Sequence, residues 1–333
     1  WAAYLQQHYA LGSTDRVAIA LPRNIQRIVA ILAVVKCGAV YVPLSTELPA
    51  ARVNYMAQAA DVSLVLSSSA LAGSYQWPAQ VPLLLTDNAE FCQTVVQCDA
   101  SMPDYRNIRA GGAAHIIFTS GSTGQPKGVA GTHAATLNRV LWMSGQYPFG
   151  RNEQCCHITS MAFTRAVWEL WLPLLSGQTL HLIDRTEVKE PALLYSRLQQ
   201  QQISRLVTAP SLLRSMLEYQ QQKGLTLDAL RYWFVSGEPL PASLASRAIV
   251  ELAPAELVNL YGSTEVMSDI SYYNVSRRGT GDAMYVPIGQ AIANTQLLLL
   301  DQQQQPVASG AIGEIVVMGT NLAQGYLAQP EQT

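Results

Sequence analysis

Short apolar segments alternate with longer amphipathic ones along most of this chain, and this alternation constrains its fold more than any other feature. Buried strands are expected at residues 17–21, 115–118, 180–183, 205–208, 232–235 and 256–260. A helix is expected after the first of them, and one of its faces carries Ile25, Ile28, Val29, Leu32 and Val35. Strands separated by helices are typical of parallel sheets covered on both faces.

The pattern changes after about residue 270, where little helix is expected. Residues 296–300 and 314–318 read as strands, which indicates a separate β-rich unit. We therefore expect an α/β protein with two interleaved, packed α/β subdomains over residues 1–270, whose mainly parallel sheets are covered by helices. A smaller β-rich, barrel-like subdomain is expected over residues 271–333.

Composition and charge exclude several classes of protein. Of the 333 residues 49% are hydrophobic and only 13% are charged, so a large core is easily filled. The net charge is -2 and no basic tract occurs, so neither nucleic acid nor a membrane is expected as a partner. The longest apolar run, residues 28–35, is far shorter than the ~20 residues of a membrane-spanning helix. Five scattered cysteines without metal-ligand spacing favour a reducing, cytoplasmic location.

The most informative stretch for function is T-S-G-S-T-G-Q-P-K-G over residues 119–128, directly after a predicted strand. Glycines allow close backbone approach and the hydroxyl side chains are donors, while Lys127 adds a positive charge. Such a loop can wrap a polyphosphate with backbone N–H groups. A flexible surface loop is the alternative, but the mixture of residue types after a buried strand favours phosphate. Because Lys127 stands between Pro126 and Gly128, the loop is not a Walker motif, and a P-loop kinase or ATPase is disfavoured.

This loop resembles the signature of the adenylate-forming superfamily, which includes acyl-CoA synthetases, luciferases and the adenylation domains of nonribosomal peptide synthetases. Four further segments resemble family motifs in the family's order, at residues 36–44, 163–177, 259–265 and 313–327. The first two of these segments and residues 287–294 favour the peptide-synthetase branch over CoA ligases.

The resemblance implies an ATP site with Mg²⁺ and assigns roles to its residues. The phosphate loop would hold the departing pyrophosphate, Glu265 would bind Mg²⁺, and Thr264 would donate a hydrogen bond to the α-phosphate. Tyr261 would stack on adenine and Asn259 would read its amino edge. With Lys127, Thr264 and Glu265 as the catalytic residues, the ATP-binding set comprises Thr119, Ser120, Gly121, Ser122, Thr123, Gly124, Lys127, Gly237, Glu238, Asn259, Tyr261, Gly262, Ser263 and Thr264. Outside this motif context, Glu265 would read as a surface carboxylate and Tyr261 as a packing residue.

The resemblance also implies an acyl pocket, and here the sequence departs from the family. The family has an aspartate that pairs with the α-amino group of the substrate, and this chain has Thr164 in its place, followed by Arg165. A hydroxyl cannot replace a carboxylate opposite an ammonium. The remaining lining positions would be Trp168, Val207, Phe234, Ser236, Leu260, Ser268 and Asp269.

Asp269 is the single carboxylate among these positions, and two interpretations of it remain open. It either pairs with Arg165 across the cavity or receives an amine of the substrate. The substrate is therefore expected to be an α-keto, α-hydroxy, aryl or β-amino acid rather than a standard α-amino acid. The alternatives are that Thr164 reflects an inactive domain, or that Asp269 makes the usual amine contact.

The resemblance predicts an enzyme that activates a carboxylic acid as acyl-AMP and loads it onto the phosphopantetheine of a carrier protein. The expected partners are the small acid, a carrier domain and neighbouring synthetase domains. The family also has a small mobile C-terminal domain, which residues 1–333 do not include, so this chain alone is expected to be weak or inactive. An acyl-CoA or aryl-CoA ligase and a degenerate, non-catalytic nucleotide-binding domain are the alternative functions.

Overall fold

The computed structural model describes residues 1–99, 108–119 and 125–333. The chain divides into two compact units. Unit 1 comprises residues 1–134, 160–164 and 323–333, and unit 2 comprises residues 135–159 and 165–322. The expected boundary at residue 270 stays a prediction, although residues 271–291 add two strands to the large sheet of unit 2.

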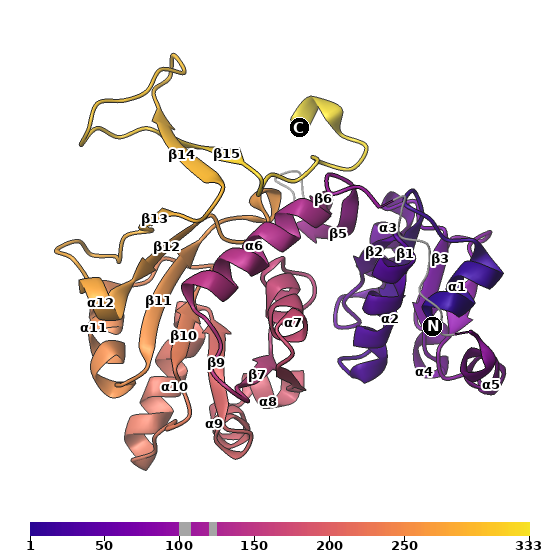
Figure 1. Ribbon diagram of the computed structural model, residues 1–333, viewed down its shortest axis with the longest axis horizontal. Coiled ribbons are helices and arrows are strands. Elements are labelled where there is room, and N and C mark those ends of the chain that lie inside the picture. Colours follow the sequence, from indigo (N-terminus) through magenta and orange to yellow (C-terminus); the bar gives the residue numbers. More distant parts are fainter. Residues whose placement is uncertain (100–107, 120–124) are drawn as a thin grey trace. The chain divides into compact units, whose positions relative to one another are not determined.

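Unit 1 is built on a sheet that, among the described residues, has the strand order β4-β3-β1-β2-β5-β6. All neighbouring strands are parallel except the antiparallel pair β5–β6. Helices lie on both sides of this sheet (Figure 1). The elements are α1 (Ala2–Tyr9), β1 (Arg16–Ala20), α2 (Ile25–Lys36), β2 (Val40–Pro43), α3 (Ala50–Ala59), β3 (Leu64–Ser67), α4 (Ser69–Ala72), β4 (Leu83–Leu85), α5 (Ala89–Gln97), β5 (Ala113–Thr119), β6 (Lys127–Thr132) and the short helix η2 (Pro330–Gln332).

Unit 2 is built on a larger sheet of order β13-β12-β11-β10-β9-β7-β8 among its described residues. Strands β8, β7, β9, β10 and β11 are parallel, and β12 and β13 are antiparallel additions. The elements are α6 (His133–Gln146), β7 (Gln154–His157), α7 (Arg165–Leu175), β8 (Thr179–Leu182), α8 (Arg185–Lys189), α9 (Pro191–Gln200), β9 (Ile203–Thr208), α10 (Pro210–Lys223), β10 (Tyr232–Val235), α11 (Ala242–Glu251), β11 (Glu256–Tyr261), η1 (Thr264–Val266), β12 (Ser271–Asn274), α12 (Val275–Arg278), β13 (Gln290–Ala291), β14 (Thr295–Leu300) and β15 (Glu314–Gly319).

These findings confirm the α/β class, the predicted strands and the change of pattern near the C-terminus. The two late apolar runs are strands β14 and β15, as predicted, and the structure shows that they pair antiparallel with each other. The helix predicted after the first strand is α2, and the apolar face named above is not its most buried side. Ile25 is 71% exposed, and the buried side carries Arg27, Ala30, Ile31, Ala33 and Val34. The helix is apolar on most sides, so apolar spacing alone did not identify the face that meets the sheet.

Local signals explain several helix ends. The side chain of Asn24 accepts a hydrogen bond from the backbone N–H of Arg27 and so caps α2. Helix α10 begins with Pro210 and ends at Gly224, whose φ of 61° is in the left-handed region that glycine adopts readily. Both termini of α10 thus follow from residue type alone.

Candidate functional site

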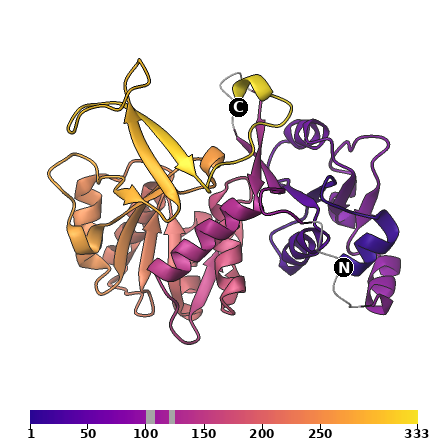
Figure 2. The same cartoon turned by 45° about the horizontal axis from the view of Figure 1, so that its top comes forward.

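The central strands of unit 2 present alternate side chains to the two faces of the sheet. Val207 lies beside Phe234, and Phe234 beside Val258, because β9, β10 and β11 are in parallel register. These side chains share one apolar cluster with Leu260, with residues of α6 and with residues of α7. Figure 2 shows α6 lying across this side of the sheet. The period of two therefore brings the predicted pocket residues Val207, Phe234 and Leu260 to the same face.

The opposite face of the sheet is occupied by α9, α10 and α11. Their apolar side chains pack in a second cluster with the intervening strand residues Leu206, Trp233, Val235 and Leu257. This face is a filled core. The face under α6 and α7 is the one on which predicted functional residues gather.

The segment between β11 and β12 is a tight loop that carries most of the predicted adenine and magnesium motif. A Cβ atom on Gly262 would lie 1.8 Å from the backbone oxygen of Ser268, so this close approach requires glycine. Met267 and Ser268 have positive φ angles of 55° and 77°, which is uncommon for residues other than glycine. The backbone N–H of Ser268 donates to the oxygen of Ser263, closing the loop. The loop thus brings Ser268 and Asp269 back to the sheet.

The predicted ATP residues in this loop have different exposures. Thr264 and Glu265 lie half-buried in η1, and Tyr261 is 40% exposed at the end of β11. Asn259 is buried, and its amide donates to the backbone oxygen of Pro287 at 3.0 Å. An exposed aromatic ring next to half-buried polar side chains is compatible with the roles expected for adenine and phosphate recognition.

Asp269 is the centre of a buried polar cluster. Its side chain is 1% exposed, and its Oδ2 atom accepts from Arg139 Nη2 at 2.9 Å and from Trp168 Nε1 at 3.1 Å. The hydroxyls of Ser236 and Ser268 donate to the same carboxylate at 2.8 and 3.0 Å. The structure thus brings together four of the predicted pocket residues by direct hydrogen bonds.

The ion-pair partner of Asp269 corrects one of the two interpretations of that residue. The expected pairing with Arg165 is wrong, because Asp269 pairs with Arg139. Arg165 instead donates through Nη1 to the backbone oxygen of Ser236 at 2.7 Å. Both arginines therefore flank Ser236, one through its carbonyl oxygen and the other through the carboxylate that its hydroxyl binds.

Sequence reasoning missed Arg139. It lies on α6 with a fully buried side chain, and its guanidinium stacks 4.8 Å from the ring centre of Trp142 and 4.7 Å from that of Trp168. The signal was present, since Arg139 shares the buried face of α6 with Ala135 and Met143, one helical turn before and after it. A charged residue on the apolar face of a helix requires a buried partner.

Gly237 and Glu238 follow β10, where they were expected to line adenosine. Gly237 has a φ of 94°, a conformation that glycine adopts without strain. The exposed carboxylate of Glu238 accepts hydrogen bonds from the backbone N–H and the hydroxyl of Ser211, at 3.2 and 3.0 Å. The role of Glu238 in binding adenosine stays a prediction.

The remaining predicted residues belong to unit 1 or lie outside the described residues. Thr119 ends β5 and Lys127 begins β6, and the Lys127 ammonium lies near the amide oxygen of Gln332 and 5.2 Å from the ring centre of Tyr326. Thr164 is 6% exposed. The predicted phosphate-binding residues Ser120, Gly121, Ser122, Thr123 and Gly124 lie outside the described residues.

Glu169 on α7 is a second buried carboxylate near the pocket face. It accepts from the backbone N–H groups of Ile158 and Thr159 at 3.1 and 2.9 Å. Burial raises the pKa of Glu169 to about 7, and these hydrogen bonds oppose the shift. It also borders a cavity of about 20 Å³, room for roughly one water, together with Trp168 and Phe234. Glu169 thus ties α7 to the segment that follows β7.

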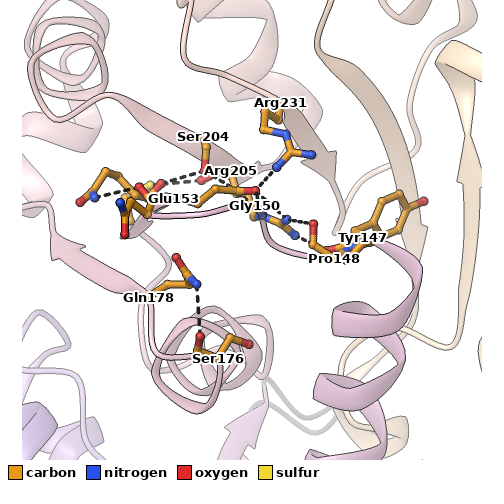
Figure 3. Close-up of polar contacts among 12 residues, drawn as sticks. Tyr147, Pro148, Gly150, Glu153, Ser176, Gln178, Ser204, Arg205 and Arg231 are labelled. Atoms are coloured by element: carbon orange, nitrogen blue, oxygen red, sulfur yellow. Dashed lines mark hydrogen bonds and ion pairs between the residues drawn. The ribbon is translucent and has the colours of Figure 1, made fainter.

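A third cluster, around Glu153, joins the segment after α6 to the sheet (Figure 3). One carboxylate oxygen of Glu153 accepts from Arg205 Nε and from the Ser204 hydroxyl, both at 2.8 Å, and the other is paired with Arg231. Arg205 also donates to the backbone oxygens of Tyr147 and Pro148, at 2.6 and 2.7 Å. The cluster therefore holds the C-terminal end of α6 to β9.

A profile of AMP-binding enzymes matches residues 1–327. The chain belongs to the AMP-binding enzyme family. This match confirms the resemblance to adenylate-forming ligases, and binding of ATP or AMP is a property of the family. In the part of the chain that the structure describes, no helix has the length and apolar character needed to span a bilayer.

Nonribosomal peptide synthetases are among the curated proteins to which this AMP-binding domain is similar. It is 33% identical over 325 residues to a dimodular nonribosomal peptide synthase of Bacillus subtilis, covering 97% of this chain and 13% of the relative. It is 34% identical to the β-alanyl-bioamine synthetase ebony of Drosophila melanogaster, covering 93% and 36%. Enterobactin synthase component F of Escherichia coli is also 34% identical, with 96% and 24% covered. The chain thus spans between about an eighth and a third of these proteins.

Solved structures show the same fold. The fold matches the nonribosomal peptide synthetase FmoA3 with a TM-score of 0.88 at 23% identity, covering 100% of this chain and 35% of that protein. A four-domain nonribosomal peptide synthetase solved with AMP and glycine matches with a TM-score of 0.83 at 27% identity, covering 99% and 23%. The AMP-binding domain therefore has the fold of peptide-synthetase adenylation domains.

Proposed function

We propose that the protein activates a carboxylic acid as its acyl-AMP and transfers the acyl group to the phosphopantetheine thiol of a carrier protein. The observation that carries this proposal is the loop after β11, which presents Thr264 and Glu265 next to the exposed ring of Tyr261. The loop belongs to a domain of the AMP-binding enzyme family. In the proposal, its residues act beside the α-phosphate.

The chemistry needs two anions to meet. A carboxylate oxygen of the acid attacks the α-phosphorus of ATP, the new P–O bond forms, and the bond to the departing pyrophosphate breaks. The protein must hold both reactants close together and offset the charge on the phosphates. In the proposal, Thr264 donates a hydrogen bond to the α-phosphate and the Lys127 ammonium stabilises the leaving pyrophosphate.

Glu265 fits a magnesium ligand. Mg²⁺ usually takes one or two protein carboxylates in nucleotide sites, and phosphate oxygens and waters complete its coordination. The half-buried carboxylate in η1 can supply that one protein oxygen. When bound, the metal would neutralise phosphate charge during the displacement.

The substrate in this proposal is an acid other than a standard α-amino acid. Thr164 stands where the family has an aspartate for the α-amino group, and Arg165 follows it. Asp269 already accepts hydrogen bonds from Arg139, Trp168 and two serines, so it has little capacity left for an amine. An α-keto, α-hydroxy or aryl acid fits this environment better than a β-amino acid.

ATP–pyrophosphate exchange in the full protein tests the proposal. The panel contains standard amino acids, their keto and hydroxy analogues, and aryl and β-amino acids. At least one acid of the keto, hydroxy or aryl class is expected to drive exchange, and Glu265→Gln and Lys127→Met are expected to lower it by about 100-fold. Glu251→Gln, a change in a surface ion pair on α11, is the control.

Three outcomes would count against parts of the proposal. Absence of exchange with every acid would favour a domain that binds nucleotide without catalysis. Exchange with a standard α-amino acid alone would refute the substrate class and keep the activity. Formation of acyl-CoA without loading of a carrier protein would replace the acceptor with free CoA.

A further inference from the structure

The buried guanidinium of Arg139 makes only some of the hydrogen bonds that it could donate. The indoles of Trp142 and Trp168 stack on it, and one nitrogen, Nη2, donates to Asp269. Its other nitrogens, Nε and Nη1, are fully buried and have no hydrogen-bond partner among the described residues. Since a buried charged donor without a partner is costly, these two nitrogens require an acceptor.

The electrostatics of the cluster indicate which kind of acceptor fits. Burial lowers the pKa of Arg139, and the Asp269 carboxylate opposes that shift. The two residues form an ion pair with a separation of 2.9 Å, so the pair as a whole carries no net charge. A second carboxylate next to the unpaired nitrogens of Arg139 would be repelled by Asp269, and an ammonium there would be repelled by the guanidinium. An uncharged oxygen has neither disadvantage.

Arg139 also contacts residues of the predicted pocket. Trp168 and Asp269, which both contact Arg139, are themselves predicted lining positions, and Asp269 connects directly to Ser236 and Ser268.

We propose that one of the two unpaired nitrogens of Arg139, Nε or Nη1, binds a carbonyl or hydroxyl oxygen of the acid substrate, apart from its reacting carboxylate. Arg139 is then a specificity residue that favours oxygen-bearing acids over acids that carry an amine at the same place. This inference rests on the proposed adenylation activity and adds a residue to its acyl pocket. Asp269 then acts as an internal counter-ion that holds the guanidinium in place, and a nitrogen that Asp269 does not bind contacts the substrate oxygen.

The test compares acids that differ in one group. Benzoate is compared with 3-hydroxybenzoate, and 3-methylbutanoate with its 2-hydroxy, 2-oxo and 2-amino derivatives, by ATP–pyrophosphate exchange in the full protein. Since a hydrogen bond to a charged group contributes about 1.5–3 kcal/mol, the wild type should prefer the favoured hydroxy or oxo acid to its parent by about 10- to 100-fold. In Arg139→Met this preference should fall to about threefold or less.

Two further variants keep the test decisive if Arg139→Met is poorly folded. Arg139→Met combined with Asp269→Leu removes both charges, which is often tolerated in a core, and it should also lose the preference for oxygen. Arg247→Lys, in a partly exposed ion pair on α11, should retain the wild-type preference. Stabilisation by each acid, measured as the increase in melting temperature, reports binding without the reaction.

The outcomes separate this inference from the proposed function. If folded Arg139 variants keep the wild-type preference for oxygen-bearing acids in the exchange assay, the role of Arg139 is refuted and the adenylation activity is not. If no acid supports exchange, the proposed function is refuted, and the melting temperatures alone then test whether Arg139 binds the acid. Equal stabilisation of wild type and variant by the hydroxy or oxo acids, or no stabilisation of either, refutes the binding role of Arg139.

Discussion

Replacing Glu153 with glutamine tests how strongly the cluster in Figure 3 stabilises unit 2. The substitution keeps the size of the side chain and removes its charge. The side chains of Glu153 and Arg205 are each 5% exposed, so the variant leaves a buried guanidinium without its counter-ion. Breaking a buried pair from one side typically costs 3–5 kcal/mol. The second partner, Arg231, is 46% exposed and should add little because water screens it.

We therefore expect Glu153→Gln to lower the free energy of unfolding by about 3–5 kcal/mol. Urea titration followed by tryptophan fluorescence is the assay, since Trp142, Trp168, Trp171 and Trp233 all belong to unit 2. The control is Glu251→Gln, which removes a pair whose side chains are 24% and 30% exposed and should cost less than about 1 kcal/mol. Equal losses for the two variants would refute the reasoning from burial.

The pH dependence gives this prediction a second readout. Burial alone would raise the pKa of Glu153, but hydrogen bonds from Arg205, Gly150 and Ser204 hold it below the ordinary value of 4.5. A lowered pKa in the folded state means that the unfolded state binds more protons, so the stabilisation is complete above the unfolded pKa. It is lost as the pH falls from 4.5 towards the folded pKa. The difference between wild type and Glu153→Gln should therefore be constant above about pH 6 and narrow below 4.5.

Three further substitutions have expected outcomes. Gly131→Ala should destabilise unit 1 by about 1–3 kcal/mol in thermal or urea unfolding, because its Cβ would lie 2.2 Å from Nε2 of buried His115. Glu169→Gln should abolish a decline in stability between about pH 4.5 and 7, because a folded pKa raised to about 7 makes the folded state bind more protons in that interval. Gly262→Ala should reduce both stability and ATP–pyrophosphate exchange, because its Cβ would lie 1.8 Å from the backbone oxygen of Ser268.

Controls make these outcomes specific. A Cβ on Gly145, within α6, would meet no atom within 4 Å, so Gly145→Ala should stabilise the protein by about 0.5–1 kcal/mol. Full stability in Gly131→Ala would show that His115 yields without cost. For Glu169→Gln the slope is the readout, since the amide also loses one of the two backbone hydrogen bonds. An unchanged slope would assign the pH dependence to other groups, and normal exchange in Gly262→Ala would contradict the requirement for glycine.

The pH dependence of stability that His115 gives to unit 1 has the opposite sign to that of Glu169. Burial lowers the pKa of this imidazole to about 3, so the folded state keeps it neutral. The unfolded chain binds a proton near the ordinary value of 6.5, and stability should therefore decrease as the pH falls below that value. Its effect opposes that of Glu169 between about pH 4.5 and 6.5, so the two slopes are best separated in single variants.

The order of residue types along the sequence was sufficient to predict the α/β class, the positions of the strands and the family. Runs such as residues 232–235 are apolar and short, and their length and their aromatic and β-branched residues favour strands. The contiguous motif at residues 259–265 predicted an adenine and magnesium loop from its residue types and spacing. The same alternation also put Val207 and Phe234 on one face, once their strands were paired.

Only the tertiary structure decided which charges meet. Arg139 and Asp269 are 130 residues apart, and Arg165 is much nearer to Asp269 in the sequence, yet the ion pair joins the first two. The packing of α6 over the sheet brings Arg139 between two indoles, and the closed loop after β11 turns Asp269 towards it. Electrostatic pairing in a core depends on distances of a few ångströms, and those distances arise from packing between elements rather than from spacing along the chain.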